Sequence, residues 1–145
     1  EMEGTVRTYD PAQRRDTHQR IRRMVEQTAA ASGAKGEAKI LEKYGVTVND
    51  PKLTARAGPA LQWAAQGDVG DAPQVGGAED FSFMADKVPA FFFFLGATAP
   101  KADMKTALPN HNPGFSVDES TLLVGVRAMS ALAADFLDST LPAGK

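Results

Sequence analysis

Residues 91–95, Phe-Phe-Phe-Phe-Leu, leave this chain fewer possible folds than any other stretch does. Successive side chains of an extended segment point to opposite sides, so four phenylalanines in a row need apolar cover on both faces. Pro89 and Gly96 bound the run and make it too short for a helix. The run therefore predicts an interior strand of an α/β sheet with helices on both faces. Binding sites in such sheets form beyond the carboxyl ends of the strands, and the loop after Gly96 leads to His111.

The composition narrows the class of protein. A chain of 145 residues, 43% hydrophobic and 23% charged, suits one soluble globular domain with its own core. A formal net charge of −2 gives no reason to expect a nucleic acid or a membrane as a partner, and the longest apolar run is too short to span a bilayer. Without cysteine, the chain can form neither disulfides nor thiolate metal sites. No signal peptide opens the chain, and we expect a cytoplasmic protein.

Residues 1–48 predict a strand, a helix and a second strand. Residues 3–9 and 38–48 alternate well enough to suggest half-buried strands. Between them, Asp10 can cap a helix with Pro11 in its first turn, and Gly33 can end that helix in a left-handed conformation. The arginines of this helix are expected on its solvated face; a patch for anions or nucleic acid is the alternative. A unit this small cannot bury its own apolar face and needs further strands.

A second helix is expected after Asn49. Asp50 can serve as its N-cap, and Pro51 suits its first position. The pair Gly58-Pro59 should kink or break this helix, since proline in a helix interior costs roughly 3 kcal/mol.

The remaining residues predict two helices around the phenylalanine strand. Residues 78–87 suit a short helix before the strand, and residues 97–109 form a polar loop after it. Asp118 can cap a last helix, and residues 142–145 should be a frayed tail. The apolar stripe of the last helix consists of Leu122, Val126, Met129, Ala133 and Phe136.

His111 is the first candidate for chemistry. A neutral imidazole is a good ligand for zinc, although a loop histidine taken alone is more often an ordinary surface residue. A catalytic metal site needs at least three protein ligands. The second histidine, His18, lies on the basic helix, where we expect it to be solvated.

Five further residues could contribute to a site. Gly76 and Gly77 permit a ligand to approach the backbone closely, or they simply make a tight turn. Glu79 and Asp80 follow them and could orient metal ligands from behind or cap the short helix. Arg7 offers a planar fork that binds a carboxylate, or it lies on an exposed sheet face.

Four motifs together point to a family. They are Glu-Gly-Thr-Val-Arg-Thr-Tyr-Asp-Pro from Glu3, Gly-Gly-Ala-Glu-Asp-Phe-Ser-Phe-Met from Gly76, Val-Pro-Ala-Phe-Phe-Phe-Phe-Leu-Gly from Val88 and His-Asn-Pro-Gly-Phe-Ser-Val-Asp-Glu from His111. In order and spacing they resemble the C-terminal part of the metal-dependent aminoacylase and hippurate-hydrolase amidohydrolases. These enzymes are relatives of the zinc carboxypeptidases with an inserted lid domain.

The resemblance implies a fold. Residues 1–48 would be the second half of a ferredoxin-like α+β lid domain, and residues 49–145 the C-terminal part of a zinc-exopeptidase-like αβα catalytic domain. The upstream ligand motifs and the catalytic glutamate of the family have no counterpart here, so we expect no catalytic residue in this chain. Because the lid strands would lack their partners, we expect the 145 residues alone to be inactive and only marginally folded.

The resemblance also implies a function. The complete site would hold two divalent ions, zinc or manganese, with His111 as the last metal ligand. Arg7 would hold the carboxylate of an N-acyl amino acid, and Gly76 and Gly77 would floor the substrate pocket. The protein would be a homodimer through its lid. The alternative is a non-catalytic dimerisation or interaction module.

Overall fold

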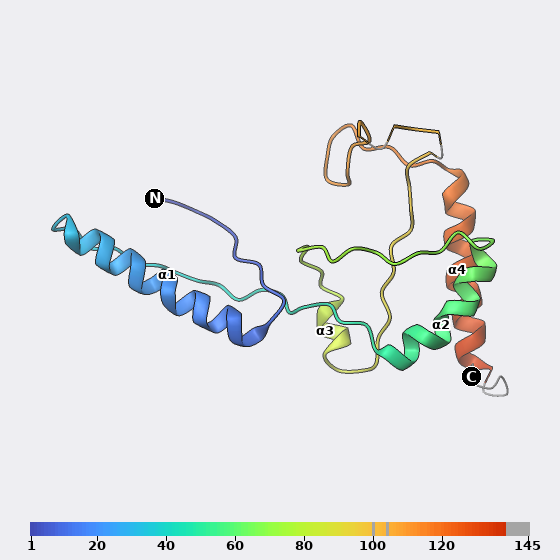
Figure 1. Cartoon of the computed structure of the whole chain (residues 1–145), viewed down its shortest axis with the longest axis horizontal. Helices are drawn as coiled ribbons and strands as arrows, with labels where there is room; N and C mark the ends of the chain where they lie inside the picture. Colours follow the sequence, from blue (N-terminus) through green and yellow to red (C-terminus); the bar gives the residue numbers. More distant parts are fainter. Residues whose placement is uncertain (100, 104, 139–145) are drawn as a thin grey trace. The chain divides into compact units, whose positions relative to one another are not determined.

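The computed structural model describes residues 1–99, 101–103 and 105–138 and contains four helices there (Figure 1). They are α1 (Pro11–Ala31), α2 (Pro51–Ala64), the single-turn α3 (Ser82–Ala85) and α4 (Ser120–Leu137). The predicted tail at 142–145 lies outside the described residues.

The predicted strands are wrong for the described part of the chain, in which residues 3–9, 38–48 and 91–95 are irregular. A strand exists only through hydrogen bonds to a neighbouring strand, and these segments find no such neighbour among the described residues. The α/β class expected from the sequence is therefore not visible in this chain, whose regular structure is helical where it is described.

Both long N-terminal helices begin as their sequences predict. The Asp10 carboxylate accepts a hydrogen bond from the Gln13 amide at 2.6 Å, and the Asp50 carboxylate accepts one from Leu53 at 2.8 Å. A proline occupies the first helical position in each case. Gly33, at φ 68°, follows the C-cap residue of α1 and takes the left-handed conformation that ends the helix.

Of the predicted kink or break at Gly58-Pro59, the break is wrong, because α2 runs through Pro59 to Ala64, and the kink stays a prediction. Two features lower the cost of this proline. Gly58 has no Cβ to clash with the proline ring, and one face of α2 packs against α4. That packing stabilises the helix although one backbone hydrogen bond is lost.

The chain divides into two compact units. The first comprises Glu1–Val48 and Gln74–Val88 and contains α1 and α3. The second comprises Asn49–Pro73 and the described residues from Pro89 onward, and contains α2 and α4.

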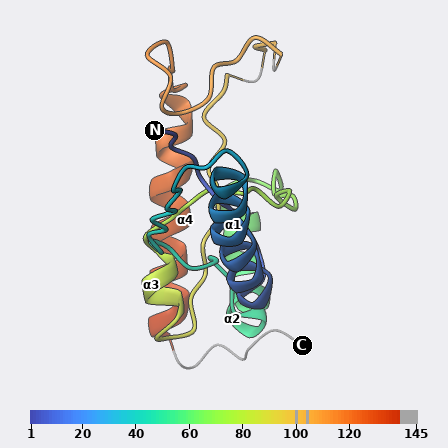
Figure 2. The ribbon, with the colours of Figure 1, turned by 90° about the vertical axis from the view of Figure 1, so that its left-hand side faces the viewer.

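In the first unit, the segment after α1 turns back along that helix (Figures 1 and 2). Gly36 lies so close to α1 that a Cβ atom there would stand 2.8 Å from the Val25 carbonyl oxygen. The ring of Tyr44 meets that of Phe83, next to α3, with centroids 5.7 Å apart. Close contacts around one long helix, α1, therefore hold the irregular segments of this unit.

In the second unit, α2 and α4 pack side by side. The Arg56 guanidinium lies 2.9 Å from the Asp135 carboxylate and also donates to the Asp135 carbonyl. It stands 5.3 Å from the centre of the Phe136 ring, within reach of a cation–π interaction. One arginine thus ties the two helices together through three contacts.

The core of the described residues is small. Its buried apolar residues are Ala57, Ala64, Ala90 and Ala128. The chain exposes 12025 Å² of accessible surface, whereas two compact proteins of half its mass would together expose about 8,700 Å². Much apolar surface that a folded domain would bury is therefore open to solvent.

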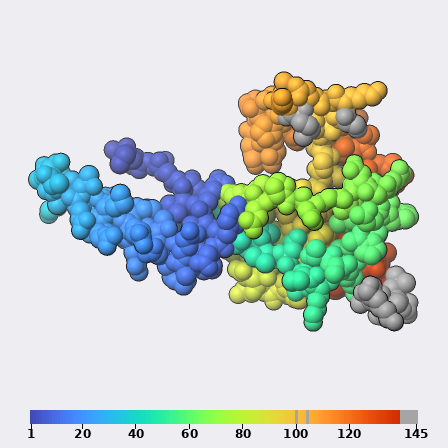
Figure 3. Space-filling view, in the orientation of Figure 1, coloured from blue at the N-terminus to red at the C-terminus, as the bar shows by residue number. Residues whose placement is uncertain are grey.

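The phenylalanine run shows the same lack of burial. Phe94 is 61% exposed and Leu95 is 40% exposed, so the predicted burial of both faces is wrong for this chain. Part of the segment from 89 to 97 lies open at the surface (Figure 3). The helices of this unit therefore leave part of the run uncovered.

Helix α4 carries the predicted stripe, but the stripe faces solvent. Val126 is 63% exposed and Met129 61% exposed, while Ala128 is buried. Among the described residues, α4 is also the one helix long and apolar enough to cross a membrane, with a mean hydropathy of 1.4. A single helix that meets this criterion is weak support for a membrane span, so the absence of a membrane partner stays a prediction.

Candidate functional site

The loop that carries His111 is tied at its base. The Asp118 amide donates to the Ala97 carbonyl at 2.8 Å, so the end of the phenylalanine segment and the start of the last helix meet. The Asp118 carboxylate accepts the Ser120 amide at 2.9 Å, and the Asp118 carbonyl accepts the Thr121 hydroxyl at 2.8 Å. The Ser120 bond lowers the pKa of Asp118 below its ordinary 3.8. The predicted cap at Asp118 is one residue off, because α4 begins at Ser120 with Glu119 as its N-cap residue; Asp118 bonds the first amide of the helix from one position further back.

His111 occupies an unusual backbone conformation at the tip of this loop. Its φ is 68°, in the left-handed region that residues other than glycine seldom adopt. The surrounding turn holds it there: the Asn112 amide donates to the Pro109 carbonyl at 3.2 Å, and the Asn112 side chain accepts the Gly114 amide at 2.9 Å. The imidazole itself is exposed. A constrained turn that presents an exposed imidazole suits the binding of an external group.

An open cavity of about 240 Å³ lies at the base of the same loop. Its lining residues are Thr98, Ala99, Ala102, Ala107, Leu108, Ser116, Val117 and Asp118. Since His111 is absent from this lining, the cavity is separate from the candidate ligand.

Arg7 and Gly76 meet in the first unit. The Arg7 guanidinium donates from Nη1 to the Gly76 carbonyl. A Cβ atom at Gly76 would lie 3.8 Å from Arg7 Cδ and 3.9 Å from the Tyr9 hydroxyl, whereas Gly77 has open space around it. The structure thus brings together two of the residues predicted to bind substrate. Because one guanidinium nitrogen uses the Gly76 carbonyl, the glycine loop fixes the direction of the fork.

Glu79 and Asp80 do not cap the short helix with their side chains. The N-cap of α3 is Phe81, which makes no side-chain capping bond. The carbonyl groups of Glu79 and Asp80 accept the amides of Ser82 and Phe83 at 3.2 and 3.0 Å. The capping alternative is therefore wrong, and their role behind a metal site stays a prediction.

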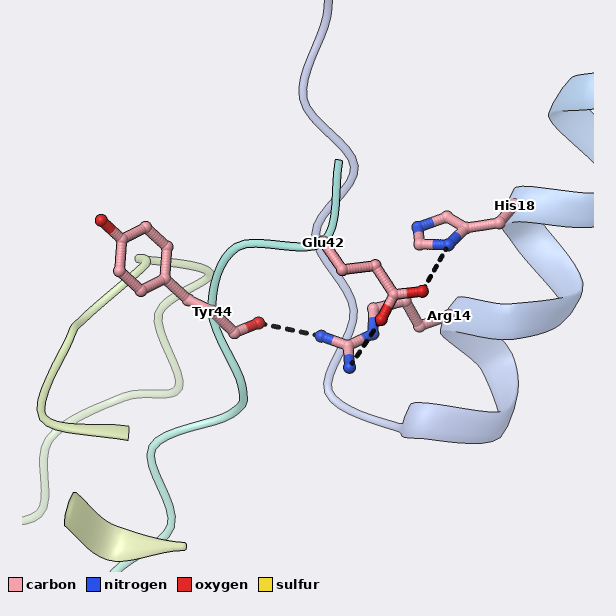
Figure 4. Close-up of polar contacts among 4 residues, drawn as sticks. All are labelled: Arg14, His18, Glu42 and Tyr44. Carbon is pink, nitrogen blue, oxygen red and sulfur yellow. Dashed lines mark hydrogen bonds and ion pairs between the residues drawn. The ribbon is translucent and has the colours of Figure 1, made fainter. Parts of the chain in front are cut away.

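His18 is buried, contrary to the prediction that it is solvated. Only 6% of the residue is exposed, and its Nδ1 lies 3.5 Å from a Glu42 carboxylate oxygen (Figure 4). The other oxygen of Glu42 lies 3.6 Å from Arg14, which also donates to the Tyr44 carbonyl at 2.8 Å. These contacts fasten the segment after α1 to the helix. The sequence could not show this, because Glu42 lies 24 residues from His18.

A complete metal site is not formed by the part of the chain that the structure describes. No group of three or more histidine, cysteine, aspartate or glutamate side chains comes together among those residues. His111 is a chemically suitable ligand, but it does not belong to a group of three potential ligands among the described residues. That further ligands come from outside this chain stays a prediction.

Comparison with known proteins decides the family. The pattern of peptidase family M20/M25/M40 matches residues 13–135 of the chain. The chain belongs to this family. The M20 family comprises metal-dependent hydrolases, and the resemblance drawn from the four sequence motifs is thereby confirmed.

Curated relatives agree with this assignment. The chain is 36% identical over 137 residues to thermostable carboxypeptidase 2 of Saccharolobus solfataricus, covering 94% of the chain and 34% of the relative. It is 32% identical over 139 residues to an N-acetylcysteine deacetylase of Bacillus subtilis, covering 96% and 34%. It is 29% identical over 130 residues to an N-acetyldiaminopimelate deacetylase of Enterococcus faecalis, covering 89% and 32%. The M20 chain thus spans about a third of the length of these relatives. No solved structure matches it.

Proposed function

We propose that this M20 chain supplies one metal ligand and the substrate-carboxylate contact of a hydrolase that cleaves the amide bond of N-acyl amino acids. The observation that carries the proposal is the exposed His111 imidazole, held at φ 68° in a hydrogen-bonded turn. Strained conformations of this kind persist where the surroundings enforce them, and they cluster at ligand sites. The names of the related deacetylases and carboxypeptidase support a substrate with an amide bond next to a carboxylate.

The metal would be held in part by His111, whose neutral imidazole suits zinc, manganese or cobalt. M20 enzymes typically hold two such ions. A bound metal pair would supply a water whose pKa is lowered enough to make it the nucleophile at neutral pH. Glu79 and Asp80 would orient ligands from behind the site, as such outer residues do in other metal sites.

Arg7 would bind the carboxylate of the substrate. Its Nη1 donates to the Gly76 carbonyl, and the guanidinium carries further N–H donors on its other nitrogens. A planar guanidinium matches a carboxylate with two parallel hydrogen bonds. The substrate would therefore be recognised by its charged end, while Gly77, with open space around it, leaves room beside the loop. Hippurate and related N-acyl amino acids have this chemistry.

The second candidate is a non-catalytic dimerisation module. The large exposed apolar surface and the absence of a three-ligand cluster among the described residues favour it. The metal content of the full in-frame product of the gene that contains this chain separates the two. Two equivalents of zinc, manganese or cobalt, with hydrolysis of N-acyl amino acids, support the enzyme. No bound metal and no turnover support the module.

A further inference from the structure

Consecutive turns with small side chains shape the cavity at the base of the loop that carries His111. The Ala102 amide donates to the Ala99 carbonyl at 2.9 Å, and the Ala107 amide donates to the Asp103 carbonyl at 3.1 Å. All three alanines line the cavity. Because a methyl group fills little space, these turns leave a hollow that larger side chains would fill.

The cavity adjoins the turn of His111 through one side chain. Leu108 lines the cavity, and a Cβ atom at Gly114 would lie 2.7 Å from Leu108 Cδ1. Gly114 belongs to the His111 turn, in which its amide donates to the Asn112 side chain at 2.9 Å. The imidazole is not part of the lining, but Leu108 is a wall that the cavity and the His111 turn share.

The lining favours a neutral, mostly apolar group. It consists of three alanines, a leucine and a valine, together with two hydroxyl groups and the Asp118 carboxylate. The hydrogen bond from the Ser120 amide lowers the pKa of Asp118 below 3.8, so this carboxylate is charged at neutral pH. A second carboxylate in the cavity would therefore meet a like charge.

The size of the cavity limits what it can hold. An engineered apolar cavity of about 150 Å³ in another protein binds benzene. The cavity of about 240 Å³ at the base of this loop therefore has room for one such ring. An acetyl group would leave most of it unfilled.

We infer that this cavity binds the acyl group of the substrate and favours a neutral group of about the size of a benzene ring over acetyl. The inference rests on the proposed function, because a substrate held at His111 is what brings an acyl group to this loop. Asp118 keeps the carboxylate end of the substrate out of the cavity, so the substrate enters with its uncharged end.

The first test measures binding in the full in-frame gene product with isotope-labelled alanine methyl groups. Benzamide and benzoate are titrated separately, because they share the ring and differ in charge. We expect benzamide to shift the methyl signals of Ala99, Ala102 and Ala107. Benzoate should shift them only in Asp118→Asn, which removes the like charge. No shift with benzamide, or equal shifts with both probes in the unsubstituted protein, overturns the inference.

The second test compares hydrolysis of the N-benzoyl and N-acetyl derivatives of one amino acid. Ala107→Leu fills the cavity, so the ratio of kcat/KM for benzoyl over acetyl should fall by about tenfold or more. Ala102→Leu repeats the change at a second wall position and should lower the ratio as well. Ala134→Leu, the same exchange at an exposed position of α4, should leave the ratio unchanged.

The outcomes separate this inference from the proposed function. An unchanged ratio in both Ala107→Leu and Ala102→Leu contradicts the inference, while the proposed function stands. Hydrolysis of neither substrate by the unsubstituted protein refutes the proposed function. The benzamide titration then still decides whether the cavity binds a neutral ring, because its readout needs no turnover.

Discussion

At the scale of residues, local chemistry was predictable from the sequence and distant pairing was not. The aspartate caps at Asp10 and Asp50 were correct, because each cap bonds an amide three residues away. The contacts of Asn49 and His18 could not be predicted, because their partners lie 43 and 24 residues away along the chain. From the sequence, Asn49 is only the residue before the second helix, and His18 only a member of a basic helix.

Arg7→Ala should mainly impair substrates that carry a free α-carboxylate. A hydrogen bond to a charged group contributes about 1.5–3 kcal/mol, so kcat/KM should fall on the order of tenfold to a hundredfold. The measurement compares an N-acyl amino acid with its C-terminal amide in the full in-frame gene product. The amide should lose much less, and Arg7→Lys should recover only part of the loss because lysine lacks the planar fork. Equal losses on both substrates would show that Arg7 does not recognise the carboxylate.

The Asp118 contact should titrate at acidic pH. Because its folded pKa is lowered by the Ser120 bond, the contact stabilises the start of α4 above the unfolded pKa and is lost as pH falls through the folded pKa. The Ser120 amide signal in a nuclear magnetic resonance titration should therefore shift with a midpoint below 3.8. Asp118→Asn keeps an acceptor but cannot ionise, so its Ser120 signal should not show this step. A midpoint at or above 3.8 in the unsubstituted chain would contradict the assignment.

At the scale of elements, helices were predictable and strands were not. A helix satisfies its backbone within itself, so α1, α2 and α4 form wherever caps and composition favour them. A strand depends on hydrogen bonds to a neighbouring strand, which residues 91–95 do not find among the described residues. Here the Asn49 side chain bonds Phe92, and Leu95 packs against Gly125 of α4. The proline in α2 shows the converse case, in which packing overrides a local penalty.

Pro59→Ala should stabilise α2. Proline in a helix interior is about 3 kcal/mol less favourable than alanine. We expect more helical ellipticity at 222 nm and a higher urea midpoint, by an amount up to this limit. Gly58→Ala, with Pro59 kept, is the contrast variant: it restores no hydrogen bond and its Cβ meets the proline ring, so it should not raise the midpoint. A lower midpoint for Pro59→Ala would mean that the proline fits a distorted turn that α2 requires.

At the scale of the whole molecule, the 145 residues alone should be marginally stable and inactive. Full burial of one phenylalanine is worth about 1.5–3 kcal/mol, while the net stability of a domain is roughly 5–15 kcal/mol. Phe94, Phe136 and many other apolar side chains are exposed in this chain. The burial free energy that they forgo is therefore comparable to the whole net stability of a domain. Thermal unfolding and oligomer size of the isolated chain check this. A monomer with a sharp transition that also hydrolyses N-acyl amino acids with added zinc or manganese would refute it.

In the complete protein, His111 is expected to bind a catalytic metal ion. The direct test is the metal content of the full in-frame gene product, compared between the unsubstituted protein, His111→Ala and Asn110→Ala, a matched change at the exposed neighbouring residue. Each protein is dialysed against zinc or manganese, its bound metal is counted, and its near-ultraviolet circular dichroism verifies the fold. We expect two ions in the unsubstituted protein and in Asn110→Ala, and in His111→Ala the loss or marked weakening of one ion together with a loss of turnover. Unchanged metal content and normal turnover in His111→Ala would contradict it.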